Sequence, residues 1–211
     1  MAGAVLSVVV STLFAAVMAW RWVRRRRPYQ LAWTIGLAMF AVAALAGVLA
    51  RSGGTTESDY RVFYLFGAIL NVAWLALGTL YLLAPRIARW GLGLVLILSA
   101  AAIAAVLGSP VDVSAAADTG KGFDASPLPR ALAGIGSGIG SVILIGGALW
   151  SAWVFLRRRH EGRRAIANVV IAGGVLVAAA GGTAAFTGAS GVVEWTNFVG
   201  VSLIFIGFLL V

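Results

Sequence analysis

Seven apolar stretches, each long enough to cross a lipid bilayer as a helix, occupy most of this chain of 211 residues. Each contains about 17–26 residues, and a helix that rises about 1.5 Å per residue crosses a hydrocarbon core about 30 Å thick in roughly 20 residues. The apolar residues run continuously, without the period-two alternation of a membrane barrel strand. The sequence therefore predicts an all-α, polytopic membrane protein with seven transmembrane helices. The stretches are residues 4–20, 31–50, 62–84, 91–108, 131–156, 167–186 and 192–211.

The composition indicates that lipid, and not water, surrounds most of the chain. Apolar residues make up 61% of the sequence and charged residues 11%, with a mean hydropathy of +0.99. A soluble domain carries about 25% charged residues, so this chain has too few of them to cover a water-facing surface. We expect one domain over 1–211, in which two helical triplets, 1–84 and 131–211, are joined by a connector helix and an external loop at 85–130.

Arginines fall in alternate gaps between the apolar stretches, and they orient the chain. A charged side chain at the membrane centre costs about 2.5–3.5 kcal/mol, and cytoplasmic loops collect Lys and Arg. We therefore predict an external amino terminus and a cytoplasmic carboxyl terminus. The many Ala, Gly and Arg residues suggest a GC-rich bacterial genome, so the expected location is a bacterial plasma membrane. The arginines concerned are Arg21, Arg24 to Arg27, Arg86, Arg89, Arg157 to Arg159, Arg163 and Arg164.

Some of these arginines have a second interpretation, as contacts for anionic lipid headgroups, which basic clusters beside a membrane helix attract. They are Arg24, Arg25, Arg26, Arg27, Arg157, Arg158 and Arg159. We favour the simpler interpretation that they act only as orientation signals. No nucleic-acid partner is expected despite the pI of about 11.4, because the basic residues stand at helix ends without a basic domain around them.

Small residues recur four apart in the stretch 131–156. The pairs are Gly134 with Gly138, Gly136 with Gly140, and Ser137 with Ser141. Because small residues let membrane helices approach closely, this face is expected to pack tightly against a neighbouring helix. The alternatives are a hinge, or a contact with another subunit or a second copy through the Gly and Ser faces of the fifth and sixth helices.

An internal repeat is a further hypothesis. A shift of about 133 residues brings Gly67 onto Gly200 and Arg24 to Arg26 onto Arg157 to Arg159. Each half then reads helix, arginine gap, helix, short external gap, helix, and the fourth helix connects them. Such a parallel three-plus-one-plus-three plan is found in transporter folds, whose sites lie between the halves. The alternative is a chance match between Ala- and Leu-rich helices.

The third stretch carries a polar and aromatic stripe at helical spacing. It contains Tyr60, Tyr64, Gly67, Asn71, Trp74, Gly78 and Tyr81. A polar side chain such as Asn71 at mid-membrane is expected to turn away from lipid. One interpretation is a ligand cavity with Tyr60, Tyr64, Asn71 and Trp74 in its wall, together with Asn197 on the matching face of the seventh helix. The other, which we favour, is aromatic side chains packed against glycines.

Ionisable residues are confined to the helix ends. Glu194 begins the seventh stretch, and pairing it with Arg51 or Arg61 would close the outer mouth of the bundle; it is also a candidate ligand-binding residue. No Asp, Glu, Lys, Arg or His lies in the middle of a stretch. Coupled transporters usually need an ionisable residue there, so this absence argues against a pump or a coupled transporter. The chain has no cysteine and one histidine, His160, so no metal site, cofactor or catalytic site is expected. The loop 109–130 is interpreted as a linker, or alternatively as a cover of the outer mouth anchored by Phe123.

Two segments, LGTLYLLAPR at 77–86 and GGALWSAWVFLRRR at 146–159, resemble uncharacterised multi-pass membrane proteins of GC-rich bacteria, a likeness that implies no activity. The helix count and orientation also resemble those of SWEET-type sugar transporters and microbial rhodopsins. The intramembrane prolines of the sugar transporters are missing, and the single lysine, Lys121, lies in the external loop. Retinal bound as a Schiff base is therefore not expected.

These features lead to two functional hypotheses for a non-enzymatic membrane protein. The first is a bundle that binds lipid or a small apolar or amphipathic ligand, or carries it across the membrane, with a cavity along the third helix. The second is a structural or accessory subunit of a larger membrane complex.

Overall fold

The computed structural model describes residues 2–119, 121–157, 162–186 and 190–210, and in these ranges the regular secondary structure is entirely helical. The α-helices are α1 (Ala2–Arg25), α2 (Pro28–Gly53), α3 (Glu57–Val62), α4 (Asn71–Leu83), α5 (Pro85–Gly108), α6 (Val113–Thr119), α7 (Pro127–Ala133), α8 (Gly140–Arg157), α9 (Gly162–Phe186) and α10 (Ser190–Leu209). Two π-helical segments, η1 (Phe63–Leu70) and η2 (Gly134–Ile139), join α3 to α4 and α7 to α8. The all-α prediction is confirmed for the described residues.

Six helices are long and apolar enough to cross a membrane. They are α1, α2, the continuous helix Glu57–Leu83, α5, the continuous helix Pro127–Arg157, and the stretch Val192–Leu209 of α10. A shorter apolar stretch, Ile166–Gly182, lies in α9. The chain is thus a multi-pass membrane protein of apolar helices.

Prolines begin three of the long helices and extend them beyond the apolar runs. Pro28, Pro85 and Pro127 each stand in the first turn of a helix, where the missing amide leaves no hydrogen bond unmade. The fourth apolar run, 91–108, is near the lower limit of about 17 residues for a helix that crosses a membrane. Because α5 begins at Pro85, this helix has 24 residues and reaches across comfortably.

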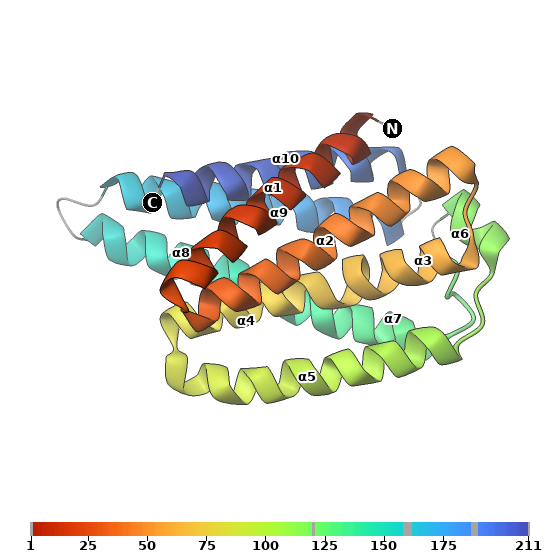
Figure 1. Ribbon diagram of the computed structural model, residues 1–211, viewed down its shortest axis with the longest axis horizontal. Helices are drawn as coiled ribbons and strands as arrows, with labels where there is room; N and C mark the ends of the chain where they lie inside the picture. The colour runs from red at the N-terminus through yellow and green to blue at the C-terminus, as the bar shows by residue number, and fades with distance from the viewer. Residues whose placement is uncertain (1, 120, 158–161, 187–189, 211) are drawn as a thin grey trace.

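Six of the long helices form a closed ring, in which each contacts its two neighbours. The order around the ring is α1, α2, α4, α8, α9 and α10, and α10 packs against α1 again. Helix α5 lies outside this ring, against η1, α4 and α7 (Figure 1). Helix α5 therefore packs on the outside of the ring.

A packed aromatic and aliphatic core lies within the ring. Phe14 and Met18 of α1 have no exposed surface, and they lie in one cluster with Leu37 and Phe208. The rings of Phe14 and Phe205 stack with their centroids 4.8 Å apart. These contacts fill the space between α1, α2 and α10.

The outer faces of the helices carry exposed apolar stripes. On α2 the exposed side chains include Leu31, Val42, Leu45 and Leu49, spaced as one helix face. On α5 they include Ile87, Trp90, Leu94 and Ile97. A soluble protein rarely exposes continuous apolar surface of this size, and such faces suit the hydrocarbon of a bilayer.

The expected close packing of the small-residue face is confirmed for half of its residues. A Cβ atom on Gly136 would lie 2.2 Å from the Ile69 carbonyl oxygen, and one on Gly140 would lie 3.0 Å from that of Val72. Gly134 and Gly138, by contrast, have nothing within 4 Å of that position. The glycines thus occupy two faces of one helix: one contacts the backbone of η1 and α4, and the other faces outward.

The stretch 109–130 is ordered in its described part, so the linker interpretation is wrong. Helix α6 is capped by Asp112, whose carboxylate accepts hydrogen bonds from the Ala115 amide (3.0 Å) and the Ser114 hydroxyl (2.6 Å). The same bonds lower the pKa of Asp112. Phe123, 1% exposed, packs with ring centroids 5.4 Å from Tyr60 and 4.9 Å from Tyr64. This segment therefore covers one end of the bundle, as the alternative prediction stated.

Replacing Gly136 with Ala is expected to destabilise the protein by about 1–3 kcal/mol, the usual range for overpacking, because the new methyl group meets backbone that cannot rotate away. The matched variant Gly138→Ala is expected to be neutral or stabilising, since alanine favours a helix by about 1 kcal/mol over glycine. Thermal unfolding of both purified variants, followed by far-UV circular dichroism, measures the difference. Equal midpoints for the two variants would show that the contact between η1 and η2 is not as close as described.

Candidate functional site

Basic residues gather at one end of the bundle, which we call the arginine end. It comprises the α1–α2 turn, the α4–α5 turn and the carboxyl end of α8, and it lies on the left in Figure 1. Helix α8 runs alongside α4 in the same direction, as the contacts of Gly140 with Val72 and of Gly147 with Thr79 show. The arginines of separate gaps are therefore brought to one side of the molecule.

The α1–α2 turn is very short and strained. Helix α1 ends at Arg25 and α2 begins at Pro28, so two residues reverse the chain. Arg26 adopts φ of 50°, the left-handed region, and its amide bonds to the Trp22 carbonyl oxygen at 2.7 Å. This conformation costs a residue with a side chain about 1–2 kcal/mol. The turn fixes the positions of Arg25 and Arg27 on either side of it.

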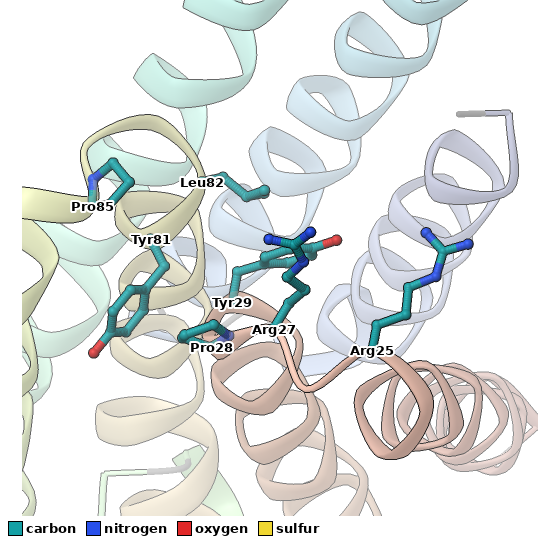
Figure 2. Close-up of a pocket in the computed structure, with 7 residues that line it drawn as sticks. All are labelled: Arg25, Arg27, Pro28, Tyr29, Tyr81, Leu82 and Pro85. Carbon is teal, nitrogen blue, oxygen red and sulfur yellow. The ribbon is translucent and has the colours of Figure 1, made fainter.

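A cavity of about 760 Å³ opens where this turn meets the α4–α5 turn. Arg25 and Arg27 both extend to the same side of the α1–α2 turn (Figure 2). Tyr81 comes from the last turns of α4 and Tyr29 from the first turn of α2, so the tyrosines are supplied by different helices. The lining residues are Arg25, Arg27, Pro28, Tyr29, Tyr81, Leu82 and Pro85.

Two helix amino termini meet at this cavity and add to its positive potential. Pro28 begins α2 and Pro85 begins α5, and neither helix has a side-chain cap. A helix amino terminus carries about half a positive charge and exposes unpaired amides. In the described part of the chain, the amides of Tyr29 and Arg86, the second residue of each helix, have no hydrogen-bond partner. The site combines two guanidinium groups with two such helix ends.

A buried glutamine supports one wall. Gln30 is 1% exposed, and its Nε2 donates to the Tyr29 hydroxyl oxygen at 3.3 Å. Because that bond occupies an acceptor position of the hydroxyl, the Tyr29 O–H remains able to donate. The cavity thus offers donors: guanidinium N–H groups and tyrosine hydroxyls.

The predicted headgroup arginines do not act as one group. Arg25 and Arg27 line the cavity. Arg24 lies over the Trp20 ring at 4.4 Å, Arg26 over Trp22 at 4.7 Å and Arg157 over Trp153 at 4.0 Å. Arg158 and Arg159 lie outside the described residues. The cation–π contacts hold Arg24 and Arg157 against exposed tryptophans and Arg26 against the partly buried Trp22.

The stripe predicted on the third helix is divided by the π-helix η1. Tyr60 of α3, just before it, and Tyr64, in its first turn, pack on Phe123. After it, Gly78 is covered by the ring of Trp33 in α2. A π-helical segment has more residues per turn than an α-helix, so residues on its two sides do not continue one face. The structure therefore brings Tyr60 and Tyr64 together but not the whole stripe.

Asn71 lies where η1 returns to α-helix. It is 4% exposed, and its Oδ1 accepts from the Val72 amide at 2.6 Å. The Ser137 hydroxyl donates to the Ala68 carbonyl oxygen at 2.5 Å. Val72 N–H and Ala68 C=O would pair with each other in a regular α-helix, and both here bond to side chains. Asn71 and Ser137 therefore stabilise the change of helix type.

Two other stripe residues keep buried polar atoms without a partner among the described residues. These are the Tyr64 hydroxyl and the Trp74 indole nitrogen. An unpaired buried polar group costs about 1–3 kcal/mol. A ligand-binding role for Tyr60, Tyr64, Asn71 and Trp74 stays a prediction. The Tyr64 hydroxyl and the Trp74 indole nitrogen are the atoms that could hydrogen-bond to such a ligand.

At the opposite end, one of the two predicted ion pairs is formed. Arg51 Nε lies 3.1 Å from Glu194 Oε1 and joins α2 to α10. Arg61 instead pairs with Glu57 at 2.6 Å, and its guanidinium donates to the carbonyl oxygens of Val106 and Ser109 at the end of α5. Asn197, one turn beyond Glu194 on α10, is partly buried. Glu194 is thus engaged in closing that end of the ring.

The cavity residues that sequence reasoning missed are Pro28, Tyr29, Tyr81, Leu82 and Pro85. Tyr29 gave one signal, because it follows the arginine run directly. Tyr81 was assigned to the stripe instead, and only the meeting of two turns far apart in the sequence reveals its role.

The fold and this site define a multi-pass helical membrane protein with a basic cavity at one end. Among the described residues, no group of His, Cys, Asp or Glu side chains is arranged to hold a metal ion. Comparison of the chain with protein-family profiles, curated proteins and solved structures finds no match.

The strain at Arg26 is testable by comparing Arg26→Gly with Arg26→Ala. Both substitutions remove the charge and the contact with Trp22, so these losses cancel between them. Glycine adopts positive φ without steric cost, and we expect the glycine variant to be more stable by about 1–2 kcal/mol. Denaturant unfolding in detergent measures the difference, and equal stability would contradict the left-handed turn.

Proposed function

We propose that this chain is a seven-helix protein of a bacterial plasma membrane that catalyses no reaction and binds an anionic amphiphile at its arginine end. One observation carries the proposal: a cavity of about 760 Å³ whose lining includes Arg25, Arg27, Tyr29 and Tyr81. Pockets of about 300–1,000 Å³ are typical of small-molecule sites. An anion in this one would face two guanidinium groups while lipid surrounds the helices that form its walls.

The position of the cavity along the bundle supports a lipid as the ligand. Exposed tryptophans stand near the arginine end, including Trp20, Trp90 and Trp153. Tryptophan is enriched at the membrane–water interface, where its ring is in the apolar region and its N–H reaches polar groups. The cavity then lies at headgroup level. By the preference of cytoplasmic loops for arginine, this is the cytoplasmic leaflet, with the amino terminus outside.

The seventh crossing in this proposal is α9. The helix has 25 residues, Gly162–Phe186, and its apolar part is Ile166–Gly182. It packs between α8 and α10 in the ring. Because both of these neighbours are long enough to cross the membrane, α9 lies beside them at the same depth and crosses as well. An odd number of crossings agrees with the alternate placement of the arginine gaps.

The order of the ring supports the three-plus-one-plus-three plan. In this plan α1 corresponds to α8, α2 to α9 and α4 to α10. The contacts α1–α2, α2–α4 and α4–α8 then correspond to α8–α9, α9–α10 and α10–α1, and all six occur. Registers agree for one pair of contacts: Gly36 lies against Leu75, and Gly207 lies against Ile171, close to the positions that a shift of about 133 residues gives. The connector α5 has no counterpart and lies outside.

A second candidate function, an accessory subunit of a membrane complex, is favoured by one observation. Gly134, Gly138 and Gly146 share an outward face of η2 and α8, with nothing within 4 Å of an added Cβ. Outward small residues allow another helix to approach closely. Copurification of a second chain, lost on Gly138→Leu, would support this function, whereas a lone monomer in native membranes would count against it.

The lipid-binding proposal predicts that a double variant, Arg25→Gln with Arg27→Gln, binds anionic phospholipid at least about tenfold more weakly. A hydrogen bond to a charged group contributes about 1.5–3 kcal/mol, and about 1.4 kcal/mol corresponds to a tenfold change. Native mass spectrometry of the detergent-solubilised protein, titrated with phosphatidylglycerol, gives the dissociation constants.

The matched control is Arg24→Gln with Arg26→Gln. It removes the same charge from the same turn, but its side chains lie over Trp20 and Trp22 and do not line the cavity. We expect it to bind within about threefold of the wild type, a change of about 0.7 kcal/mol, because exposed charges outside the cavity are screened by water and many exposed ion pairs contribute little measurable energy. If both double variants lost the same affinity for phosphatidylglycerol, the binding would come from the general positive charge of the turn and not from the cavity.

A further inference from the structure

The arginine-end cavity offers many hydrogen-bond donors and almost no side-chain acceptors. Resting on the proposed function above, we propose that it selects a lipid phosphomonoester, a headgroup with three unsubstituted phosphate oxygens, over a phosphodiester or a zwitterionic headgroup. The polar side chains of the lining are Arg25, Arg27, Tyr29 and Tyr81. None is a carboxylate or an amide, which an ammonium or hydroxyl group in the headgroup would need as a partner.

The donors match the oxygens of a terminal phosphate. A guanidinium group presents a planar fork that binds two phosphate oxygens at once. Arg25 ends α1 and Arg27 directly precedes α2, so both guanidinium groups stand at one short turn. The Tyr81 hydroxyl is turned away from both of them (Figure 2). Two guanidinium forks can engage three free oxygens, whereas a phosphodiester offers two. Gln30 does not line the cavity: its Nε2 donates to the Tyr29 hydroxyl oxygen, and its Oε1 is buried without a partner among the described residues.

Charge favours the same headgroup. A phosphomonoester carries a charge of about −1.5 to −2 at pH 7, with a second ionisation near pH 6. The charged side chains of the cavity are Arg25 and Arg27, and the amino termini of α2 and α5 add partial positive charge. Arg24, Arg26 and Arg86 lie close by in sequence at the same turns. A dianion compensates this potential better than a monoanion, and a zwitterion does not compensate it.

The cavity is suited to a phosphate that belongs to a lipid. Its volume of about 760 Å³ is larger than a phosphate group needs. Leu82 lies in its wall and is also exposed on the outside of α4. The exposed stripe of α2 that includes Leu31, Val42 and Leu45 begins one turn from Pro28 at the rim. Acyl chains can therefore follow the apolar face of α2 while the phosphate stays in the basic end.

The experiment titrates the full-length protein in detergent with three dioleoyl lipids: phosphatidic acid, phosphatidylglycerol and phosphatidylethanolamine. Native mass spectrometry at pH 7.5 and 5.5 gives each dissociation constant. We expect phosphatidic acid to bind at least tenfold more tightly than phosphatidylglycerol at pH 7.5, and at least threefold more tightly at pH 7.5 than at pH 5.5. Binding of phosphatidylglycerol, a monoanion at both pH values, is expected not to change.

Arginine and tyrosine side chains do not change charge between these pH values, so the pH dependence is expected to arise from the phosphate. His160, the single histidine, lies outside the described residues, and the variant His160→Gln removes its titration as a cause. The preference for phosphatidic acid is expected to survive that substitution. It is expected to be lost in the double variant Arg25→Gln with Arg27→Gln. It is expected to be retained in the double variant Arg24→Gln with Arg26→Gln, whose side chains do not line the cavity.

Different failures have different meanings. Equal affinity for phosphatidic acid and phosphatidylglycerol, with both above phosphatidylethanolamine, would overturn the selectivity and leave the anionic-lipid function standing. Equal affinity for all three lipids would overturn both. Full competition by millimolar glycerol 3-phosphate, with no gain from acyl chains, would show that the site takes a free phosphate ester and would overturn the lipid assignment.

Discussion

The exclusion of arginine from hydrocarbon is the physical constraint on which the rest of this molecule depends. It requires that the α1–α2 turn, the α4–α5 turn and the end of α8 remain at a membrane surface, and the packing brings them to one end of the bundle. Arg25 and Arg27 are exposed, as an orientation signal requires, and they also line a cavity with Tyr29 and Tyr81. The same residues thus serve both orientation and the proposed binding site.

Close backbone contact holds the two halves of the ring together. Hydrophobic burial does not drive helix association in lipid, so packing and hydrogen bonds take over. Gly136 and Gly140 let η2 and α8 reach the backbone of η1 and α4. Both helices have a π-helical segment at this contact, and the Ser137 hydroxyl bonds to the Ala68 carbonyl oxygen across it. The opposite seam, between α1 and α10, is closed by the Phe14 and Phe205 rings.

Much of the architecture could be predicted from the sequence, because it follows from local patterns. Long apolar runs gave the helices, and the glycines four apart gave a close helix contact. Charge complementarity gave the Arg51–Glu194 pair, although Arg61 was an equal alternative. The outcome for Arg61 depends on the free carbonyl groups at the end of α5, which no local pattern reveals.

The features that could not be predicted arise from tertiary contacts. The π-helix η1 divides the stripe between Tyr64 and Asn71, and the backbone groups at its end are satisfied by Ser137 from a distant helix. Phe123 is buried because it meets two tyrosines that precede it by more than a helix length. The cavity depends on two turns that are adjacent only in the folded chain. Sequence periodicity contains no information on such meetings.

Accessibility of single cysteines from each side of the membrane tests the charge-based orientation most directly. The natural chain has no cysteine, so Ser52→Cys, beside Arg51, and His160→Cys, in the α8–α9 connection, each introduce one thiol. In intact cells, a membrane-impermeant maleimide is predicted to label position 52 and to reach position 160 only after the membrane is broken. Labelling of position 160 in intact cells would contradict the orientation, and with it a lipid site in the cytoplasmic leaflet.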